Sequence, residues 1–199
     1  MAVDQYALTT LAGAKRFMGI TGTANDTLIE ELIDSVSDAI ESWCRVKIKQ
    51  RTFTEYHPGQ GYSYVFVDNP PIISVTSVYD DIDRGFSSSY LVDSSYYTTD
   101  GSYAGEGRIQ LWQGKLYFQE GIMNVKVTYS GGYAAVPDDV EMACNALVSM
   151  WYNIREKQGL ASETIDDYRY TMADEKEVQQ GGMPSHIQAL LGPFQRYAI

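Results

Sequence analysis

The chain shows a helical pattern of apolar and polar residues towards both ends and a two-residue alternation in between. Residues 26–43 carry an apolar stripe at helical spacing, with acidic residues on the opposite side. A second apolar stripe follows Pro137 at steps of three and four residues: Val140, Cys144, Leu147, Trp151 and Ile154. We therefore predict two long antiparallel helices, joined through Trp43, Leu147 and Trp151, as a helical core.

Residues 45–133 alternate instead between apolar and polar residues, which is typical of strands. Pro70 and Pro71 separate two of these strands, because proline cannot donate a hydrogen bond to a ladder. The Ser-, Asp- and Gly-rich stretch DDIDRGFSSSY, residues 80–90, is predicted to be an exposed loop. The rest of this region, up to residue 133, is predicted to be a meander of short strands with turns at glycines.

The resulting fold class is α+β, with an antiparallel β-region inserted into a helical core that also has short terminal helices. Gly131, Gly132 and Pro137 are predicted to form the joint between the last strand and the second long helix, with Pro137 in the first helical turn. We expect a single domain, residues 1–199. Its predicted segments are N-terminal helices in 1–44, a β-rich insertion in 45–133, a core helix in 134–158, a polar arm in 159–183 and a C-terminal helix in 184–199.

The net charge of −11 argues against a protein that wraps nucleic acid by neutralising phosphates. It is compatible with a protein that lets DNA pass without gripping it. The N-terminus lacks the pattern of a signal peptide, and no apolar stretch approaches the length of a membrane span, so no membrane partner is expected. The 16 tyrosines, concentrated in the strand-rich part, indicate a surface able to pack against itself or a partner.

One positive patch stands out in this acidic chain: Arg45, Lys47, Lys49 and Arg51 alternate with apolar residues. On one strand face these side chains are candidates for contacts with DNA phosphates or with a neighbouring subunit. The alternative is an ordinary solvated edge strand, on which lysines discourage unwanted pairing.

No pattern in the sequence indicates a catalytic site, a cofactor or a metal centre. The two histidines, His57 and His186, are far apart in the chain and have no Cys or His at ligand spacing. Cys44 and Cys144 both fall in helical patterns; a disulfide between them is the alternative to two buried thiols, which the patterns favour. The acidic clusters are explained by a hydrophilic loop and by a helix first turn.

Two other classes of protein compete with a structural role. A carbohydrate-binding β-module would use aromatic side chains as stacking platforms, and Tyr96, Tyr97, Tyr103 and Trp112 are the candidates. A small hydrolase would use the acidic loops, with one carboxylate raised in pKa by burial.

Four segments together resemble the head–tail connector (adaptor, head-completion) family of tailed phages. They are LAGAKRFMGITGTANDTLIEELIDSVSDAIESWCRVKI, DNPPIISVTSVY, VKVTYSGGYAAVPDDVEMACNALVSMWYNIRE and MPSHIQALLGPFQRY. The first is similar to the family's opening helices and Gly-Ile-Thr turn, and the third to its Val-Thr-Tyr strand, Gly-Tyr turn and Val-Pro-Asp helix start. The β-insertion from Asp80 to Gly121 and the polar arm depart from the family in length.

The resemblance implies a structural protein without enzymatic activity. It implies a homo-oligomeric ring, twelvefold in the virion, that sits on the portal protein and receives a tail or stopper protein. DNA then passes through the ring with only transient, non-specific contacts. The implied location is the virion neck, with assembly in the host cytoplasm. Another neck or tail-completion protein of similar architecture is the nearest alternative.

If the chain has this role, two sets of residues are candidates for contacts with partners. Leu190, Leu191, Phe194 and Tyr197 form an apolar series near the C-terminus and are candidates for docking on the portal. Arg155 and Glu156 at the end of the second long helix are candidates for a bridge between subunits; an ordinary surface pair is the alternative.

Overall fold

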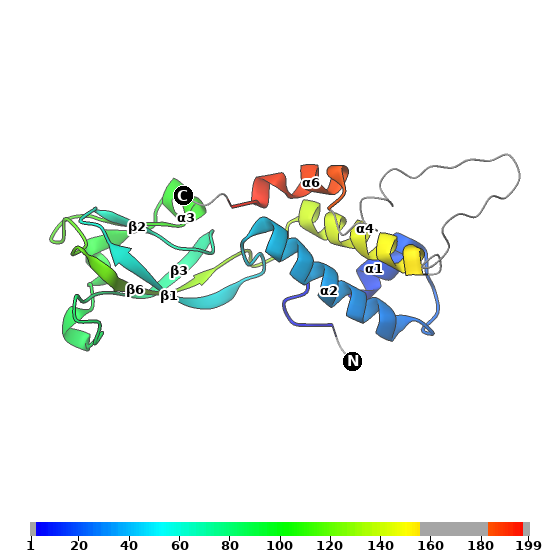
Figure 1. Cartoon of the computed structure of the whole chain (residues 1–199), viewed down its shortest axis with the longest axis horizontal. Helices are drawn as coiled ribbons and strands as arrows, with labels where there is room; N and C mark the ends of the chain where they lie inside the picture. The colour runs from blue at the N-terminus through cyan, green and yellow to red at the C-terminus, as the bar shows by residue number, and fades with distance from the viewer. Residues whose placement is uncertain (1–2, 156–182, 197–199) are drawn as a thin grey trace, which may run out of the picture. The chain divides into compact units, whose positions relative to one another are not determined.

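The computed structural model describes residues 3–155 and 183–196 (Figure 1). The chain divides into two compact units: unit 1 consists of residues 1–45 and 136–199, and unit 2 of Val46–Ala135. Several helices and two antiparallel sheets make the fold mixed α+β, which confirms the predicted class at this level. Within the described part of the chain, no helix has the length and apolarity needed to cross a membrane. The predicted polar arm lies outside the described residues, apart from its last residue.

Unit 1 is helical. Its elements are α1 (Leu11–Met18), α2 (Asp26–Cys44), α4 (Asp138–Ile154), α6 (Ser185–Leu191) and the 3-10 turn η4 (Gly192–Phe194). Helix α4 contacts α1, α2 and α6, so it is the central helix of the unit (Figure 1). Its buried apolar side chains are Val140, Ala143, Cys144, Leu147, Val148 and Ile154. The predicted stripe is therefore the packing face, widened by residues at neighbouring positions.

Capping residues define the ends of the helices. The Thr10 hydroxyl accepts a hydrogen bond from the backbone N–H of Gly13 at 3.0 Å, which caps α1. Gly19 ends α1 with a φ of 70°, a left-handed conformation that suits glycine. Pro137 was predicted in the first turn of its helix, but it is the N-cap residue of α4, with extended backbone angles. Its carbonyl accepts the first N–H groups of the helix, from Val140 and Glu141.

Unit 2 contains two three-stranded antiparallel sheets. The first has the order β1-β6-β3 and the second β2-β5-β4. The first sheet is formed by β1 (Arg51–Gly59), β3 (Ile72–Asp80) and β6 (Gly121–Gly131), and the second by β2 (Tyr64–Phe66), β4 (Tyr97–Thr98) and β5 (Arg108–Leu111). The short elements η1 (Ser88–Tyr90), η2 (Ser94–Tyr96) and α3 (Ser102–Glu106) lie between strands. The predicted meander thus includes a short helix.

The stretch 80–90 is not a wholly exposed loop, because Asp80 and Asp81 are buried. The Asp80 carboxylate accepts a hydrogen bond from the Gln119 backbone and pairs with Lys115 at 2.7 Å. The Asp81 carboxylate accepts two backbone N–H groups of its own loop, at 3.0 and 2.7 Å. Composition predicted solvated carboxylates here; internal donors instead satisfy them inside the unit.

The core of unit 2 is apolar but contains one buried polar network. Tyr129 on β6 is fully buried, and its hydroxyl donates a 2.6 Å hydrogen bond to Oε1 of Glu55 on β1. The same hydroxyl accepts the backbone N–H of Asn69 at 2.9 Å, and the Asn69 side-chain amide donates to Glu55 at 3.0 Å. Burial and the neighbouring Glu55 raise the pKa of Tyr129, so the phenol stays protonated.

Replacing Leu147 by Ala is expected to destabilise unit 1 by about 2–5 kcal/mol, because Leu147 is buried on the central helix and the smaller side chain leaves a cavity. Chemical denaturation followed by helical circular dichroism measures the change. Met142→Ala on the same helix is the matched control, since Met142 is 54% exposed and its loss is expected to change stability by less than about 0.5 kcal/mol. Equal effects of the two substitutions would contradict the assigned packing face.

Tyr129→Phe keeps the ring but removes the hydroxyl that serves both Glu55 and the Asn69 backbone. We expect a loss of about 1–3 kcal/mol in the free energy of unfolding, because a buried carboxylate and a backbone donor each lose a partner. Near-UV circular dichroism during denaturation is the measurement. Tyr62→Phe is the control, because Tyr62 is 52% exposed. A Tyr129→Phe protein as stable as this control would show that the network contributes little.

Candidate interaction surfaces

The three residues predicted to join the long helices differ in burial. Leu147 on α4 is buried, whereas Trp43 on α2 and Trp151 on α4 are half-buried. The Trp43 carbonyl accepts a hydrogen bond from the side chain of Gln195 at 3.4 Å, beyond η4. The structure therefore places Leu147 in the core of unit 1 and the two tryptophans at its margin.

The two glycines predicted at the end of the last strand occupy positions that exclude a side chain. A Cβ atom on Gly131 would lie 2.3 Å from the carbonyl oxygen of Asn69. Gly132 has a φ of 93°, and a Cβ atom there would lie 2.7 Å from the carbonyl oxygen of Ile48. Its N–H donates to the Pro71 carbonyl at 2.9 Å. Both glycines thus allow three backbone segments of unit 2 to approach closely.

The C-terminal apolar series does not form one exposed face. Leu191 is fully buried in unit 1, whereas Leu190 and Phe194 are half-buried. Tyr197 lies outside the described residues. The Arg196 backbone N–H donates to the carbonyl of Cys44 at 2.8 Å, which fastens this segment to the end of α2. Leu191 therefore belongs to the internal packing of the unit.

The four basic residues do not share one strand, so the predicted basic strand face is wrong in its local structure. Arg45 is exposed and ends α2 in a left-handed conformation, with a φ of 57°. Strand β1 begins only at Arg51, and Lys49 forms an isolated bridge with Tyr133. Lys47, Lys49 and Arg51 are half-buried. The alternation in this stretch comes from an irregular connection between α2 and β1, in which the apolar residues Val46 and Ile48 are buried.

Arg155 at the end of α4 makes contacts within its own helix. Its guanidinium lies 3.5 Å from the centre of the Tyr152 ring and donates to the Tyr152 carbonyl. Glu156, its predicted companion in a bridge between subunits, lies outside the described residues. The bridge stays a prediction.

The connection between β5 and β6, together with the start of β6, exposes a group of large apolar side chains that, apart from Trp112, the sequence patterns did not single out. We call it the apolar segment; its members are Trp112, Leu116, Tyr117, Ile122 and Met123. Leu116 and Ile122 are 72% and 78% exposed. A strand meander would bury alternate side chains here, but most of these residues precede β6 and lie in irregular backbone. A run of apolar residues between Gly114 and Gly121 without alternation was the available signal.

The four aromatic residues considered as a carbohydrate platform differ in exposure. Tyr96 and Trp112 are 40% and 48% exposed. Tyr97, however, packs against the apolar core of unit 2. The Tyr103 ring is covered by the guanidinium of Arg108, 4.7 Å from the ring centre. Only two of the four rings are thus available for stacking.

Both cysteines are free and buried in unit 1, which confirms the prediction of buried thiols. Burial, reinforced by Glu41, raises the pKa of Cys44 to about 11. Burial also raises the pKa of Cys144 to about 12. Because the thiolate is the reactive form, neither side chain is an activated nucleophile.

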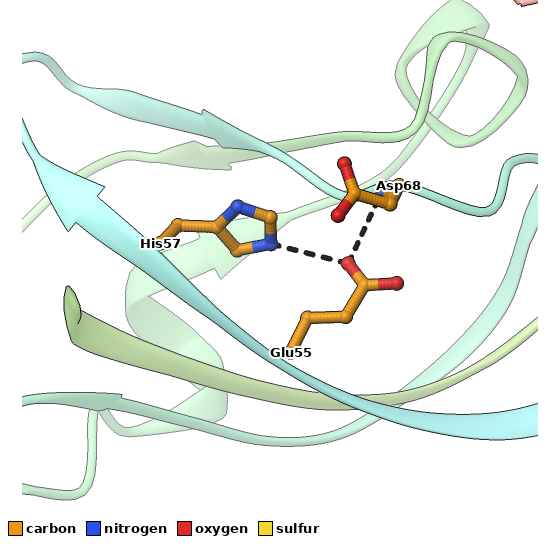
Figure 2. A group of neighbouring side chains, drawn as sticks. All are labelled: Glu55, His57 and Asp68. Atoms are coloured by element: carbon orange, nitrogen blue, oxygen red, sulfur yellow. Dashed lines mark hydrogen bonds and ion pairs between the residues drawn. The ribbon is translucent and has the colours of Figure 1, made fainter.

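A cluster of Glu55, His57 and Asp68 is the one group of three potential metal ligands found in the described part of the chain (Figure 2). Nε2 of His57 lies 3.1 Å from Oε2 of Glu55, and the Asp68 backbone N–H donates to the same oxygen at 2.8 Å. Burial alone would raise the pKa of Glu55. Hydrogen bonds from His57, Tyr129, the Asp68 backbone and Asn69 outweigh burial and lower this pKa to about 2.

Comparison with known proteins places this fold in context. A family model described as "Head completion protein" matches residues 7–197. A chain in the neck of an empty gene transfer agent (GTA) particle, computed with C6 symmetry, is similar with a TM-score of 0.63 and 15% identity, covering 100% of this chain and 95% of that chain. A chain in the virion of a native GTA particle has a TM-score of 0.61 and 16% identity, with 100% and 94% covered.

A third similar chain comes from the neck of a native GTA particle computed with C12 symmetry. Its TM-score is 0.57 and its identity 16%, with 100% of this chain and 97% of that chain covered. At these identities the likenesses establish a shared fold. No curated protein matches the sequence. The family model spans nearly the whole chain, and it confirms the resemblance drawn from the four sequence segments. The chain belongs to the head completion protein family, and its predicted role as a structural head–tail connector of a phage-like particle is confirmed at the level of the family.

Proposed function

We propose that this protein forms a homo-oligomeric ring, twelvefold in the virion, in the neck of a tailed phage, prophage or phage-like particle. The ring lies between the portal protein and a tail or stopper protein, and DNA passes through it. Membership of the head completion protein family over residues 7–197 is the observation that carries this proposal. The similar GTA neck chains, from structures computed with C6 and C12 symmetry, support the ring.

Within this role we propose that α2 and α4 form an antiparallel core and that the strand-rich residues 45–133 are an insertion into one connector domain. The polar arm in residues 159–183 completes this proposed division. Contacts of α4 with α1, α2 and α6 support a helical core built around one helix. Pro137 as N-cap and Gly132 at its positive φ are the residues proposed to define the passage from strand to helix.

Contacts between neighbouring copies are proposed to involve the apolar segment. Single exposed apolar residues are ordinary on a protein surface, but a group of large ones within twelve residues marks an interaction site. The exposure of Leu116 and Ile122 exceeds that of any other large apolar side chain among the described residues. A second copy of this chain is the proposed occupant, since a ring requires every subunit to meet two neighbours. Arg155 with Glu156 remains a second candidate contact.

Docking on the portal is proposed for the C-terminal segment. Leu191 is buried within unit 1, so the candidate contact residues reduce to Leu190, Phe194 and Tyr197. The hydrogen bond from the Arg196 backbone to the Cys44 carbonyl holds the chain in place after Phe194. A surface held in a fixed conformation loses less entropy on binding than a free tail.

The proposed role is structural rather than enzymatic, and its contact with DNA is transient. The buried carboxylates Asp80 and Asp81 accept internal hydrogen bonds, which explains them without acid–base chemistry. A net charge of −11 disfavours tight binding to phosphates. Arg45, exposed at the end of α2, and the half-buried Lys47, Lys49 and Arg51 are the candidates for a brief contact. Assembly in the host cytoplasm is part of this proposal.

Light scattering after size exclusion, over a range of protein concentrations, tests ring formation together with negative-stain images of the heaviest species. We expect closed rings with a central hole. Ile122→Asp is expected to shift the mass towards the monomer, because it places a charge in the proposed contact. Ile82→Asp is the matched control, since Ile82 is also an exposed isoleucine of unit 2, at 56%. Loss of rings in both variants, or in neither, would rule out the apolar segment as the specific contact.

Portal docking is tested by binding of the purified chain to the portal protein of the same particle. Leu190→Ala combined with Phe194→Ala is expected to weaken binding by about tenfold or more, because apolar anchors dominate such contacts. These substitutions are preferable to deletion of the C-terminal segment, which would also remove the buried Ile187 and Leu191. His186→Gln, at an exposed position of α6, is the control. Unchanged binding by the double variant would end this part of the proposal.

A further inference from the structure

We propose that Glu55, His57 and Asp68 bind a divalent transition metal ion of the zinc class (Figure 2). The proposal is independent of the role in the neck. It also departs from the expectation of no metal site, which rested on the distance along the chain between His57 and His186. The ligand set found in the structure uses one histidine and two carboxylates, a combination that histidine and cysteine spacing does not reveal.

The strand geometry brings the first two ligands together. Glu55 and His57 are two residues apart on β1, so their side chains point to the same face of the sheet. Asp68 follows β2, which belongs to the other sheet of unit 2. The three side chains point toward one another, and their ligand atoms all lie within 4.8 Å of each other (Figure 2). Two separate segments therefore converge on one point.

The distances suit a small metal ion. Zinc binds nitrogen and oxygen at about 2.0–2.2 Å in tetrahedral sites, which places two ligand atoms roughly 3.3–3.6 Å apart. Nε2 of His57 and Oε2 of Glu55 are 3.1 Å apart, so an ion between them replaces the shared proton and requires only a slight separation. Asp68 is exposed, and its ligand oxygen lies within 4.8 Å of the other two ligand atoms, so a rotation of its side chain brings this oxygen to the third position.

Outer hydrogen bonds already hold Glu55 in the orientation that a ligand needs. Its Oε1 accepts bonds from the Tyr129 hydroxyl at 2.6 Å and from the Asn69 amide at 3.0 Å. Its Oε2 accepts the Asp68 backbone N–H and faces His57 with its remaining lone pair. Metal sites depend on such outer bonds to orient their carboxylates, and here they come from the buried core.

The mixture of ligands selects the class of metal. Imidazole nitrogen suits zinc, nickel, cobalt and copper, whereas magnesium and calcium prefer shells made of oxygen alone. Three protein ligands leave a fourth position for water. The bound ion would link β1 of the first sheet to the segment that follows β2 of the second. Binding to the folded form alone stabilises unit 2.

The test uses the full chain, freed of metals by a chelator that is then removed. Calorimetric titration with Zn²⁺ is expected to show one ion per chain and a rise in the melting temperature. Co²⁺ in place of Zn²⁺ is expected to give visible absorption bands of a tetrahedral site. An excess of Mg²⁺ or Ca²⁺ should displace neither ion. Weak binding of many ions, or equal binding of Ca²⁺, would show only attraction to an acidic surface and would overturn the proposal.

Paired variants locate the ion. His57→Gln and Asp68→Asn are each expected to weaken binding at least about tenfold, since even outer contacts of metal sites change affinity by 10–100-fold. His186→Gln removes the other histidine of the chain, and Asp100→Asn removes another exposed aspartate of unit 2; both should bind like the original protein. Circular dichroism of the metal-free variants confirms that each is folded. Unchanged affinity in both cluster variants, or a loss in His186→Gln, would place the ion elsewhere and refute the assignment.

Discussion

Each unit of this protein is built around one central element that contacts or pairs with several others. In unit 1 the element is α4, which contacts α1, α2 and α6. In unit 2 it is β6, which pairs with β1 on one edge and β3 on the other, and whose Val125, Val127 and Tyr129 are fully buried. The two elements follow one another closely in the chain. One continuous stretch, residues 121–154, therefore organises both cores.

The interior of unit 2 combines this apolar packing with charged groups that are fully supplied with partners. Glu55, Asp80 and Asp81 are carboxylates with little exposure, and each accepts hydrogen bonds from backbone or side-chain donors. Because a buried carboxylate without donors is costly, these bonds restrict how the loops after β2 and β3 are placed. The hydrogen bonds to Glu55 also fix its carboxylate beside the imidazole of His57. Structural support and ligand orientation thus arise from one network.

The apolar residues of this chain divide between internal packing and an exposed surface. The inward-facing side chains of α4 and of β6 are each buried within their own unit. In contrast, the apolar segment remains exposed in the single chain. Likewise Leu191 serves the fold, while its neighbour Leu190 is half-buried and accessible. Two adjacent leucines therefore have different roles, because the helix directs one side chain into the core and the other towards the surface.

Local patterns in the sequence determined much of this protein. The two helical stripes fall on α2 and α4, and the two prolines marked the break before β3. These features depend on residues close together in the chain, so periodicity and the position of proline reveal them. The joint order of four such segments was sufficient to identify the head completion family.

Only the tertiary structure decided which polar residues are buried and which distant residues meet. Asp80 has the composition of a loop residue, yet Lys115 and the backbone of Gln119, two donors brought by the fold, make its burial favourable. The four basic residues alternate like a strand, but the left-handed turn at Arg45 ends that regularity. Asp68 meets Glu55 and His57 because two sheets converge. Local conformation depends on neighbouring residues, so the sequence alone determines it. Contacts between distant residues depend on long-range packing, which produces no periodic pattern in the sequence.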